Sequence, residues 1–117
     1  PDLLNLLNEC LRILKPGGVF SAAVPNARLY LEAYYNPINF DPALFCRYEP
    51  AYHYNSKIDY VNYMAYMGGH HHYMFDEENL DSILRKTGFK IVRPREFDNV
   101  LDMEVRHFVT IYVHCEK

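Results

Sequence analysis

The sequence predicts an α/β fold, and three features support this prediction. The first 14 residues carry apolar side chains at helical spacing, and Lys-Pro-Gly-Gly follows them at residues 15–18. A short, almost wholly apolar run follows from Val19 to Val24. Near the other end, a helical pattern at residues 77–87 precedes two runs with strand character. Helices that alternate with short apolar strands indicate a sheet covered by helices.

The first expected helix spans residues 2–14. Its leucines recur every three or four residues, which places them on one stripe, and Asp2 is suited to cap its start. Pro16 cannot continue this helix, and the glycines after it can close it in a left-handed conformation. The run Val19–Val24 is typical of a strand buried on both faces, and Pro25 ends its hydrogen-bonding ladder.

The middle of the chain is rich in tyrosine. Ten of the eleven tyrosines lie between Tyr30 and Tyr73. We expect residues 27–70 to form a lid-like insertion that contains one short helix, from about Asp59 to Met67. Two interpretations stay open: the rings contact an aromatic or amphipathic ligand, or they pack on one another.

Regular structure is expected again after Phe75. Asp76 is a suitable N-cap for a helix over residues 77–87, and Gly88 can close it. Two strands are expected next, Lys90–Arg93 and His107–Cys115. About a dozen residues separate them, too few for a helical crossover, so we expect an antiparallel connection.

Composition excludes several classes of protein. A chain of 117 residues fits a single domain, 1–117, and a formal net charge of −3 argues against non-specific binding of nucleic acid. No run approaches the roughly 20 apolar residues that span a bilayer, so no membrane contact is expected. The three cysteines are widely spaced, which favours a reducing cytoplasm over a disulfide framework.

Three stretches of the chain resemble parts of one family. Residues 9–20 contain a helix that ends in Leu-Lys-Pro-Gly-Gly before an apolar run, and residues 75–89 contain Phe-Asp-Glu-Glu-Asn-Leu followed by Thr-Gly-Phe. With the closing run Val109–Val113, they resemble the C-terminal half of a class I S-adenosylmethionine-dependent methyltransferase. The resemblance implies a partial Rossmann-like sheet made of the family's fifth, sixth and seventh strands, with the seventh antiparallel between the other two.

The resemblance also implies a function. The reaction would be methyl transfer from S-adenosylmethionine to a small-molecule acceptor, with this chain supplying the acceptor side. The pairs Gly17-Gly18 and Gly68-Gly69 do not form the Gly-x-Gly-x-x-Gly cofactor turn, so no cofactor-binding residue is assigned. We therefore expect a truncated domain that is inactive alone. The alternative is a non-catalytic α/β module for binding or assembly.

A further expectation concerns assembly. In the family, a fourth strand lies beside the fifth. Without such a strand, Val19–Val24 would present an unpaired apolar edge, so a homodimer or other pairing through this edge is expected.

Candidate site residues follow the first strand and the insertion. Ligands of open α/β sheets bind beyond the carboxyl ends of the strands, so Asn26, Tyr30 and Tyr34 are candidates for substrate binding. Pro25-Asn26 is equally suited to an ordinary turn.

Three successive histidines form the second group of candidates. Because they would point to different sides of an extended chain, a metal site, and with it zinc-dependent hydrolysis, is not favoured. His71 or His72 is the better candidate for a general base, and His70 for substrate contact. The alternative is that all three are polar residues at the base of the lid. The acidic group Asp98, Asp102 and Glu104 is interpreted as a solvated connection rather than as a catalytic pair.

Overall fold

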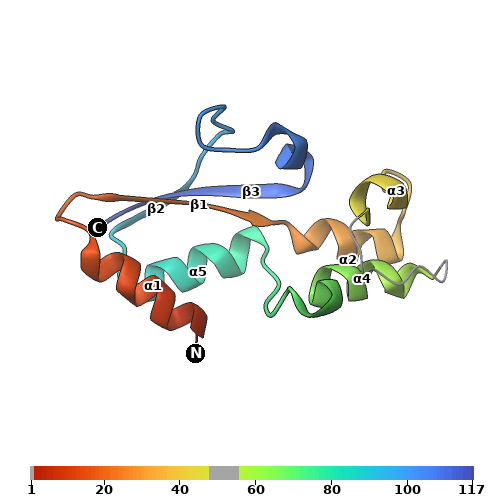
Figure 1. The fold of residues 1–117 in the computed structure, drawn as a ribbon, viewed down its shortest axis with the longest axis horizontal. Helices are drawn as coiled ribbons and strands as arrows, with labels where there is room; N and C mark the ends of the chain where they lie inside the picture. The colour runs from red at the N-terminus through yellow and green to blue at the C-terminus, as the bar shows by residue number, and fades with distance from the viewer. Residues whose placement is uncertain (1, 48–55) are drawn as a thin grey trace. The chain divides into compact units, whose positions relative to one another are not determined.

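The computed structural model describes residues 2–47 and 56–117. The chain forms two compact units, which Figure 1 shows as a ribbon. Unit 1 comprises Pro1–Val24 and Glu77–Lys117, and unit 2 comprises Pro25–Asp76. Unit 2 is thus inserted in the sequence between the two parts of unit 1.

Unit 1 contains a three-stranded sheet in the order β1-β3-β2. Its strands are β1 (Val19–Pro25), β2 (Ile91–Pro94) and β3 (Thr110–Glu116). The central strand β3 is antiparallel to β2. The end of β3 meets the start of β1, because the Lys117 nitrogen donates to the Gly18 carbonyl at 3.0 Å and Lys117 accepts from the Gly17 nitrogen at 3.1 Å. The closing strand therefore lies antiparallel between the other two, and this part of the predicted fold is confirmed.

Two helices cover one side of this sheet (Figure 1): α1 (Asp2–Ile13) and α5 (Glu77–Thr87). They bury Leu7 from α1 and Leu80 and Leu84 from α5. The Phe20 ring of β1 stacks on the Phe89 ring at 5.5 Å between centroids. The two helices were both predicted, the second with the bounds that the structure has.

The Lys-Pro-Gly-Gly joint closes α1. Gly17 has a φ of 78°, a left-handed conformation that is unfavourable for residues with a Cβ atom. The carbonyl of Leu14, left without a helical partner, accepts from Lys117 Nζ at 2.7 Å. The last residue of the chain thus stabilises the end of the first helix.

The connection from β2 to β3 differs from the prediction in one respect. The strand expected at His107–Cys115 begins later, because residues Glu104–Val109 form a 3-10 helix, η2. The alternation of side chains at 107–109 fits a strand, but the Thr110 hydroxyl donates to the Arg106 carbonyl and the His107 ring bonds the Tyr112 hydroxyl, at 3.1 Å from Nδ1. These local bonds favour the tighter turn.

The prediction of a solvated acidic connection is wrong for Asp102, whose side chain is 3% exposed. Its two oxygens accept from Arg95 Nη1 and Nη2 at 2.6 and 2.7 Å. Arg95 Nε also donates to the Ser21 hydroxyl at 2.7 Å, and its guanidinium lies over the Tyr112 ring. The bonds from Arg95 lower the pKa of Asp102 to about 2. This ion pair fastens the connection to β1 and β3.

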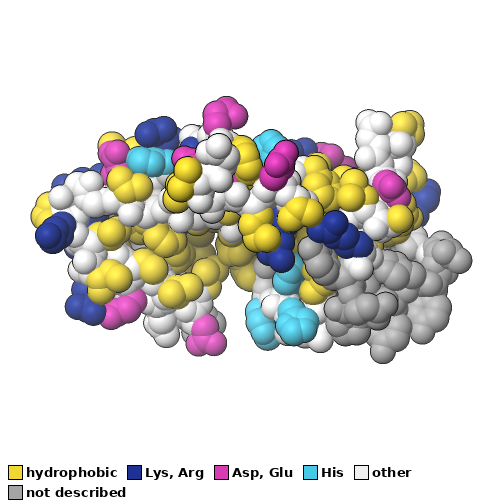
Figure 2. Space-filling view, turned by 45° about the horizontal axis from the view of Figure 1, so that its top comes forward, with side chains coloured by type: hydrophobic (Ala, Val, Ile, Leu, Met, Phe, Trp, Pro, Cys, Tyr) yellow, Lys and Arg dark blue, Asp and Glu magenta, His cyan; other side chains and the backbone are white. Residues whose placement is uncertain are grey.

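Exposed hydrophobic side chains are frequent on the face that Figure 2 shows, where they lie between charged ones. Five that the structure exposes fall within nine residues of the β2–β3 connection: Val100, Leu101, Met103, Val105 and Phe108. Polar contacts rather than burial of these side chains therefore hold this segment in place. Among the residues that the structure describes, no helix combines the length and the apolar composition needed to cross a membrane.

Unit 2 is helical in its described part. It contains α2 (Ala27–Tyr35), α3 (Pro42–Phe45), α4 (Lys57–Tyr66) and the 3-10 turn η1 (Met67–Gly69). The helix expected at Asp59–Met67 is confirmed as α4, with its start two residues earlier. The prediction gave no helix at 27–35, and this was wrong: Asn26 caps α2, which buries Ala27, Tyr30 and Ala33 on one face.

Candidate active site

All six side chains that the sequence singles out belong to unit 2: Asn26, Tyr30, Tyr34, His70, His71 and His72. A backbone bridge joins the first of them to Phe75, three residues after His72. Asn26 pairs in parallel with Phe75, and the Ala27 nitrogen donates to the Phe75 carbonyl at 2.8 Å. The segment that follows the histidines is therefore fixed to the start of α2.

Asn26 has a structural role at this point. Its side-chain oxygen accepts from the Arg28 nitrogen at 3.1 Å, which caps α2. The residue is 6% exposed. Its amide thus helps to begin the helix, and substrate contact by Asn26 stays a prediction.

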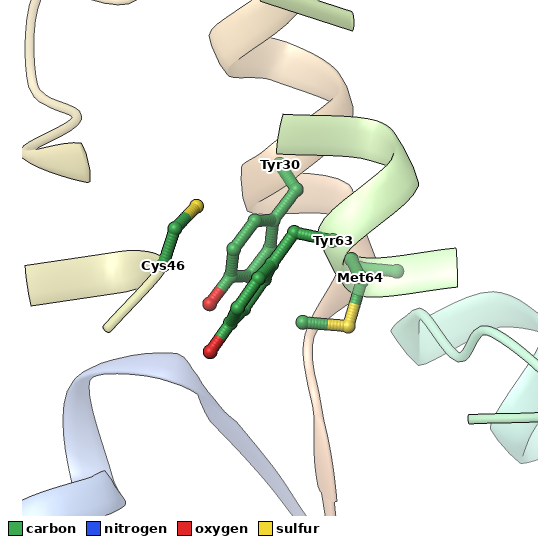
Figure 3. Close-up of a cluster of buried hydrophobic side chains, with 5 residues drawn as sticks. Tyr30, Cys46, Tyr63 and Met64 are labelled. Atoms are coloured by element: carbon green, nitrogen blue, oxygen red, sulfur yellow. The ribbon is translucent and has the colours of Figure 1, made fainter. Parts of the chain in front are cut away.

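Tyr30 lies in the core of unit 2, with 3% of its surface exposed. Its hydroxyl donates to the Phe45 carbonyl at 2.7 Å, and its ring stacks on Tyr63 at 6.0 Å between centroids. Figure 3 shows these two rings side by side, with Cys46 and Met64 around them. Burial raises the pKa of Tyr30, so its phenol stays protonated. The geometry of Tyr30 fits the interpretation in which the tyrosine rings pack on one another.

Tyr34 lies one helical turn after Tyr30 and is exposed. Its ring meets the Tyr35 ring edge-on, at 5.2 Å between centroids. An exposed phenol of this kind is accessible to a ligand, whereas that of Tyr30 is not.

The three histidines follow η1, in which Met67 and Gly68 have φ values of 43° and 61°. His71 Nδ1 lies 2.7 Å from the Met64 carbonyl oxygen. Because a carbonyl oxygen can only accept, Nδ1 must carry the proton, and the neutral ring keeps its lone pair on Nε2. His70 and His72 are exposed, whereas His71 is half-buried.

The anchor of His71 connects it to the core. Met64 buries its side chain in the cluster of Ala27, Tyr30, Cys46 and Tyr63, while its carbonyl holds the imidazole. A ring fixed in one tautomer on a packed helix can accept a proton at Nε2 from a hydroxyl or an amine placed against it. Of the three histidines, His71 has the geometry that suits a general base.

The described residues do not fit a cofactor turn. Such a turn lies between a strand and the following helix. Here β1 passes into α2 through Pro25-Asn26, whereas Gly17 and Gly18 precede a strand and Gly68 and Gly69 lie in η1.

Metal and thiol chemistry find no support in the described part of the chain. Within residues 2–47 and 56–117, no cluster of three or more His, Cys, Asp or Glu side chains is placed to hold a metal ion. Burial raises the pKa of Cys46 to about 12 and that of Cys115 to about 11, so both stay as unreactive thiols.

Comparison with known families finds a match that covers most of the chain. The family model of a methyltransferase domain matches residues 1–93. The chain therefore belongs to the methyltransferase-domain family, of the class I S-adenosylmethionine-dependent type. No curated protein and no solved structure matches the chain.

Proposed function

From this family membership, we propose that the chain carries the acceptor side of an S-adenosylmethionine-dependent methyltransferase that acts on a small-molecule acceptor. The match over residues 1–93 is the observation that carries the proposal. In this proposal the glycine-rich cofactor turn is supplied outside these 117 residues, and the chain has little activity by itself. Three cysteines without disulfides favour a cytoplasmic location.

His71 is the proposed general base. Methyl transfer depends mostly on proximity and alignment, but a hydroxyl or ammonium acceptor must also lose a proton. The bond from Nδ1 to the Met64 carbonyl supports this role, because it leaves Nε2 as the proton acceptor. In this role, the acceptor's proton passes to Nε2. His70 and Tyr34, both exposed, are proposed to contact the substrate.

Calorimetric titration with S-adenosylmethionine tests the proposal. It is made on this chain and on a natural form that is extended at the N-terminus. We expect no detectable heat of binding for the 117 residues and clear binding by the extended form. Binding by neither form would contradict the proposal and favour a non-catalytic module. This alternative is supported by the positions of the glycine pairs, which do not lie between a strand and the following helix. Tight binding by the short chain would show that the cofactor site is wrongly located.

A matched pair of variants tests the role of His71. In an active extended form, we expect His71→Ala to lower kcat by about 100-fold or more, because the proton acceptor is lost. His72→Ala, which removes an exposed neighbour, should leave kcat nearly unchanged. The base should also appear as a pH dependence of kcat that His71→Ala abolishes. Equal effects of the two variants would contradict the assignment.

We further infer that β1 pairs with another strand. Among the described residues, β3 lies on one side of β1 and no strand lies on the other. A free edge of this kind invites pairing, either in a homodimer or with another segment. Sedimentation of this chain should show a dimer that forms with concentration, and a monomer at all concentrations would contradict homodimer formation.

A further inference from the structure

An open pocket of about 380 Å³ lies within unit 2, and none of the six predicted site residues lines it. We refer to it as the α2 pocket, because it extends along α2 and the segment between α2 and α3. Its lining residues are Leu29, Glu32, Ala33, Tyr35, Asn36, Ile38, Asn39, Phe40 and Phe45. Its volume falls at the lower end of the range of small-molecule sites, roughly 300–1,000 Å³.

The buried part of the pocket wall is apolar and aromatic. Ala33 is 2% exposed, and Leu29 beside it on α2 is half-buried. The Phe40 and Phe45 rings stack at 4.6 Å between centroids with an interplanar angle of 28°. Flat rings with small aliphatic neighbours suit the face or edge of another ring.

Two large side chains at the pocket are almost fully exposed: Tyr35 at 84% and Ile38 at 82%. The backbone around Ile38 is held by local bonds, since the Asn36 nitrogen donates to the Glu32 carbonyl and the Phe40 nitrogen donates to the Pro37 carbonyl. A ligand that covers the exposed Ile38 side chain removes apolar surface from water, and the ordered turn lowers the entropic cost of binding. The wall therefore presents unused apolar surface to an incoming molecule.

The polar groups of the pocket indicate which ligand charge it favours. Among the lining residues that the structure describes, Glu32 is the one acidic residue and none is basic. Its Oε1 accepts from Arg28 Nη1 at 2.7 Å, so the carboxylate is held in place. Asn36 and Asn39 add neutral amides. This arrangement favours a ligand that donates hydrogen bonds, through a hydroxyl or an amino group, and disfavours an anion.

We propose that the α2 pocket binds a ring of the methyl acceptor, which is an aromatic or alicyclic molecule that carries a hydroxyl or amino group and no negative charge. The pocket begins at Leu29, within one helical turn of Asn26, the residue that follows β1. The identification of the ligand as the acceptor rests on the proposed function, whereas the binding of a ring does not.

Three probes that share a phenol ring test the proposal on the full chain: 4-methylphenol, tyramine and 3-(4-hydroxyphenyl)propionate. Amide and methyl NMR shifts at neutral pH report their binding. We expect shifts at the pocket residues with the neutral and the cationic probe, and binding of the anionic probe weaker by about fivefold or more. Glu32→Gln should reduce this difference between tyramine and the propionate.

A matched pair of isoleucine variants identifies the surface. Ile38→Ala should weaken binding of 4-methylphenol by about fivefold, because the ligand loses an apolar contact. Ile58→Ala, at an exposed isoleucine of α4 outside the lining, should leave it unchanged. Equal effects of the two variants would overturn the proposal.

Other outcomes of the titration are equally decisive. No shifts at the pocket, shifts centred on other residues, or equal binding of all three probes would overturn the proposal. Shifts at Tyr35 and Ile38 that follow protein concentration without any probe would show a second copy in the pocket and would also overturn it. Ring binding by a protein whose extended form fails to bind S-adenosylmethionine would refute the proposed function while the pocket assignment stands.

Discussion

The two units of this chain are stabilised by different kinds of contact. Unit 1 depends on a regular sheet, on helices followed by turns that contain glycine, and on the ion pair of Arg95 and Asp102. Unit 2 depends on aromatic rings, with Tyr30 at the centre of contacts to Phe40, Phe45 and Tyr63. The difference shows that local sequence patterns determine much of the structure of unit 1, whereas packing of aromatic side chains determines that of unit 2. The predictions below test this contrast.

The largest expected effect is in unit 2, where Tyr30→Ala removes the central ring and its hydroxyl bond to Phe45. Truncation of a buried aromatic side chain costs about 3–5 kcal/mol of the free energy of unfolding. We expect the amides of α2 and α4 to lose protection from hydrogen exchange. Tyr30→Phe, which keeps the ring, should cost roughly 1–3 kcal/mol, because the hydrogen bond from the hydroxyl to the Phe45 carbonyl is lost.

Leu84→Ala provides the matching change in unit 1, since Leu84 is 1% exposed. It should destabilise unit 1 by about 2–5 kcal/mol. If the units are stabilised separately, each variant lowers hydrogen-exchange protection mainly in its own unit. Equal loss of protection in both units after either change would show a single cooperative structure and would remove the contrast.

The Arg95–Asp102 ion pair predicts that the stability of unit 1 depends on pH. The pKa of Asp102 is lowered from 3.8 to about 2, chiefly by the hydrogen bonds from Arg95. Because the folded pKa lies below the unfolded one, the pair stabilises the fold above pH 3.8 and loses this contribution as the pH falls towards 2. Urea unfolding at several pH values should show that the free energy of unfolding falls with pH over this range; the slope of this dependence is the quantity to compare.

Two variants separate Asp102 from the other acids of its connection. Asp102→Asn should be less stable at neutral pH and should show a smaller slope between pH 4 and 2. Glu104→Gln, which changes an exposed acid of the same connection, should keep the slope of the parent chain. A slope that persists in Asp102→Asn would show that other carboxylates cause it.

Much of unit 1 could be predicted from the sequence because local rules determine it. The bounds of α5 follow from acidic residues in the first turn and from Gly88 at the end, and Lys-Pro-Gly-Gly marks the end of α1. The short connection predicts that β3 is antiparallel to β2, and the resemblance to the family predicts its position between β1 and β2. The Arg95–Asp102 pair was missed because contacts between a loop and two strands leave no periodic signal.

In unit 2 the signals were present but ambiguous. Asn26 is an ordinary N-cap, yet Pro25 before it and the tyrosines after it favoured an irregular insertion, so α2 was not predicted. The anchor of His71 is a backbone carbonyl, that of Met64, and no side-chain pattern reveals such a partner. The α2 pocket likewise depends on how α2 and the following turn pack, which hydrophobic spacing alone does not define.

A smaller effect is expected at the start of α2. Asn26→Ala should cost about 1 kcal/mol of the free energy of unfolding, because the Arg28 nitrogen loses its capping acceptor. Asn26→Ser restores a cap and should recover most of this stability. If activity of an extended form stays low in Asn26→Ser while stability recovers, Asn26 contacts the substrate, and if both recover, it acts only as a cap.

The smallest expected effect compares surface ion pairs in the two units. Arg28–Glu32 on α2 and Asp81–Arg85 on α5 both join residues four apart, and all four side chains are about half exposed. Glu32→Gln should cost only about 0.3–0.5 kcal/mol, and added salt should reduce this loss further. Asp81→Asn should behave similarly, as measured by urea unfolding at low and high salt. A much larger loss for Glu32→Gln would mean that the Glu32 carboxylate helps to shape the α2 pocket in the free protein. The variant would then change both the charge and the structure of the pocket, and it could not test the charge alone.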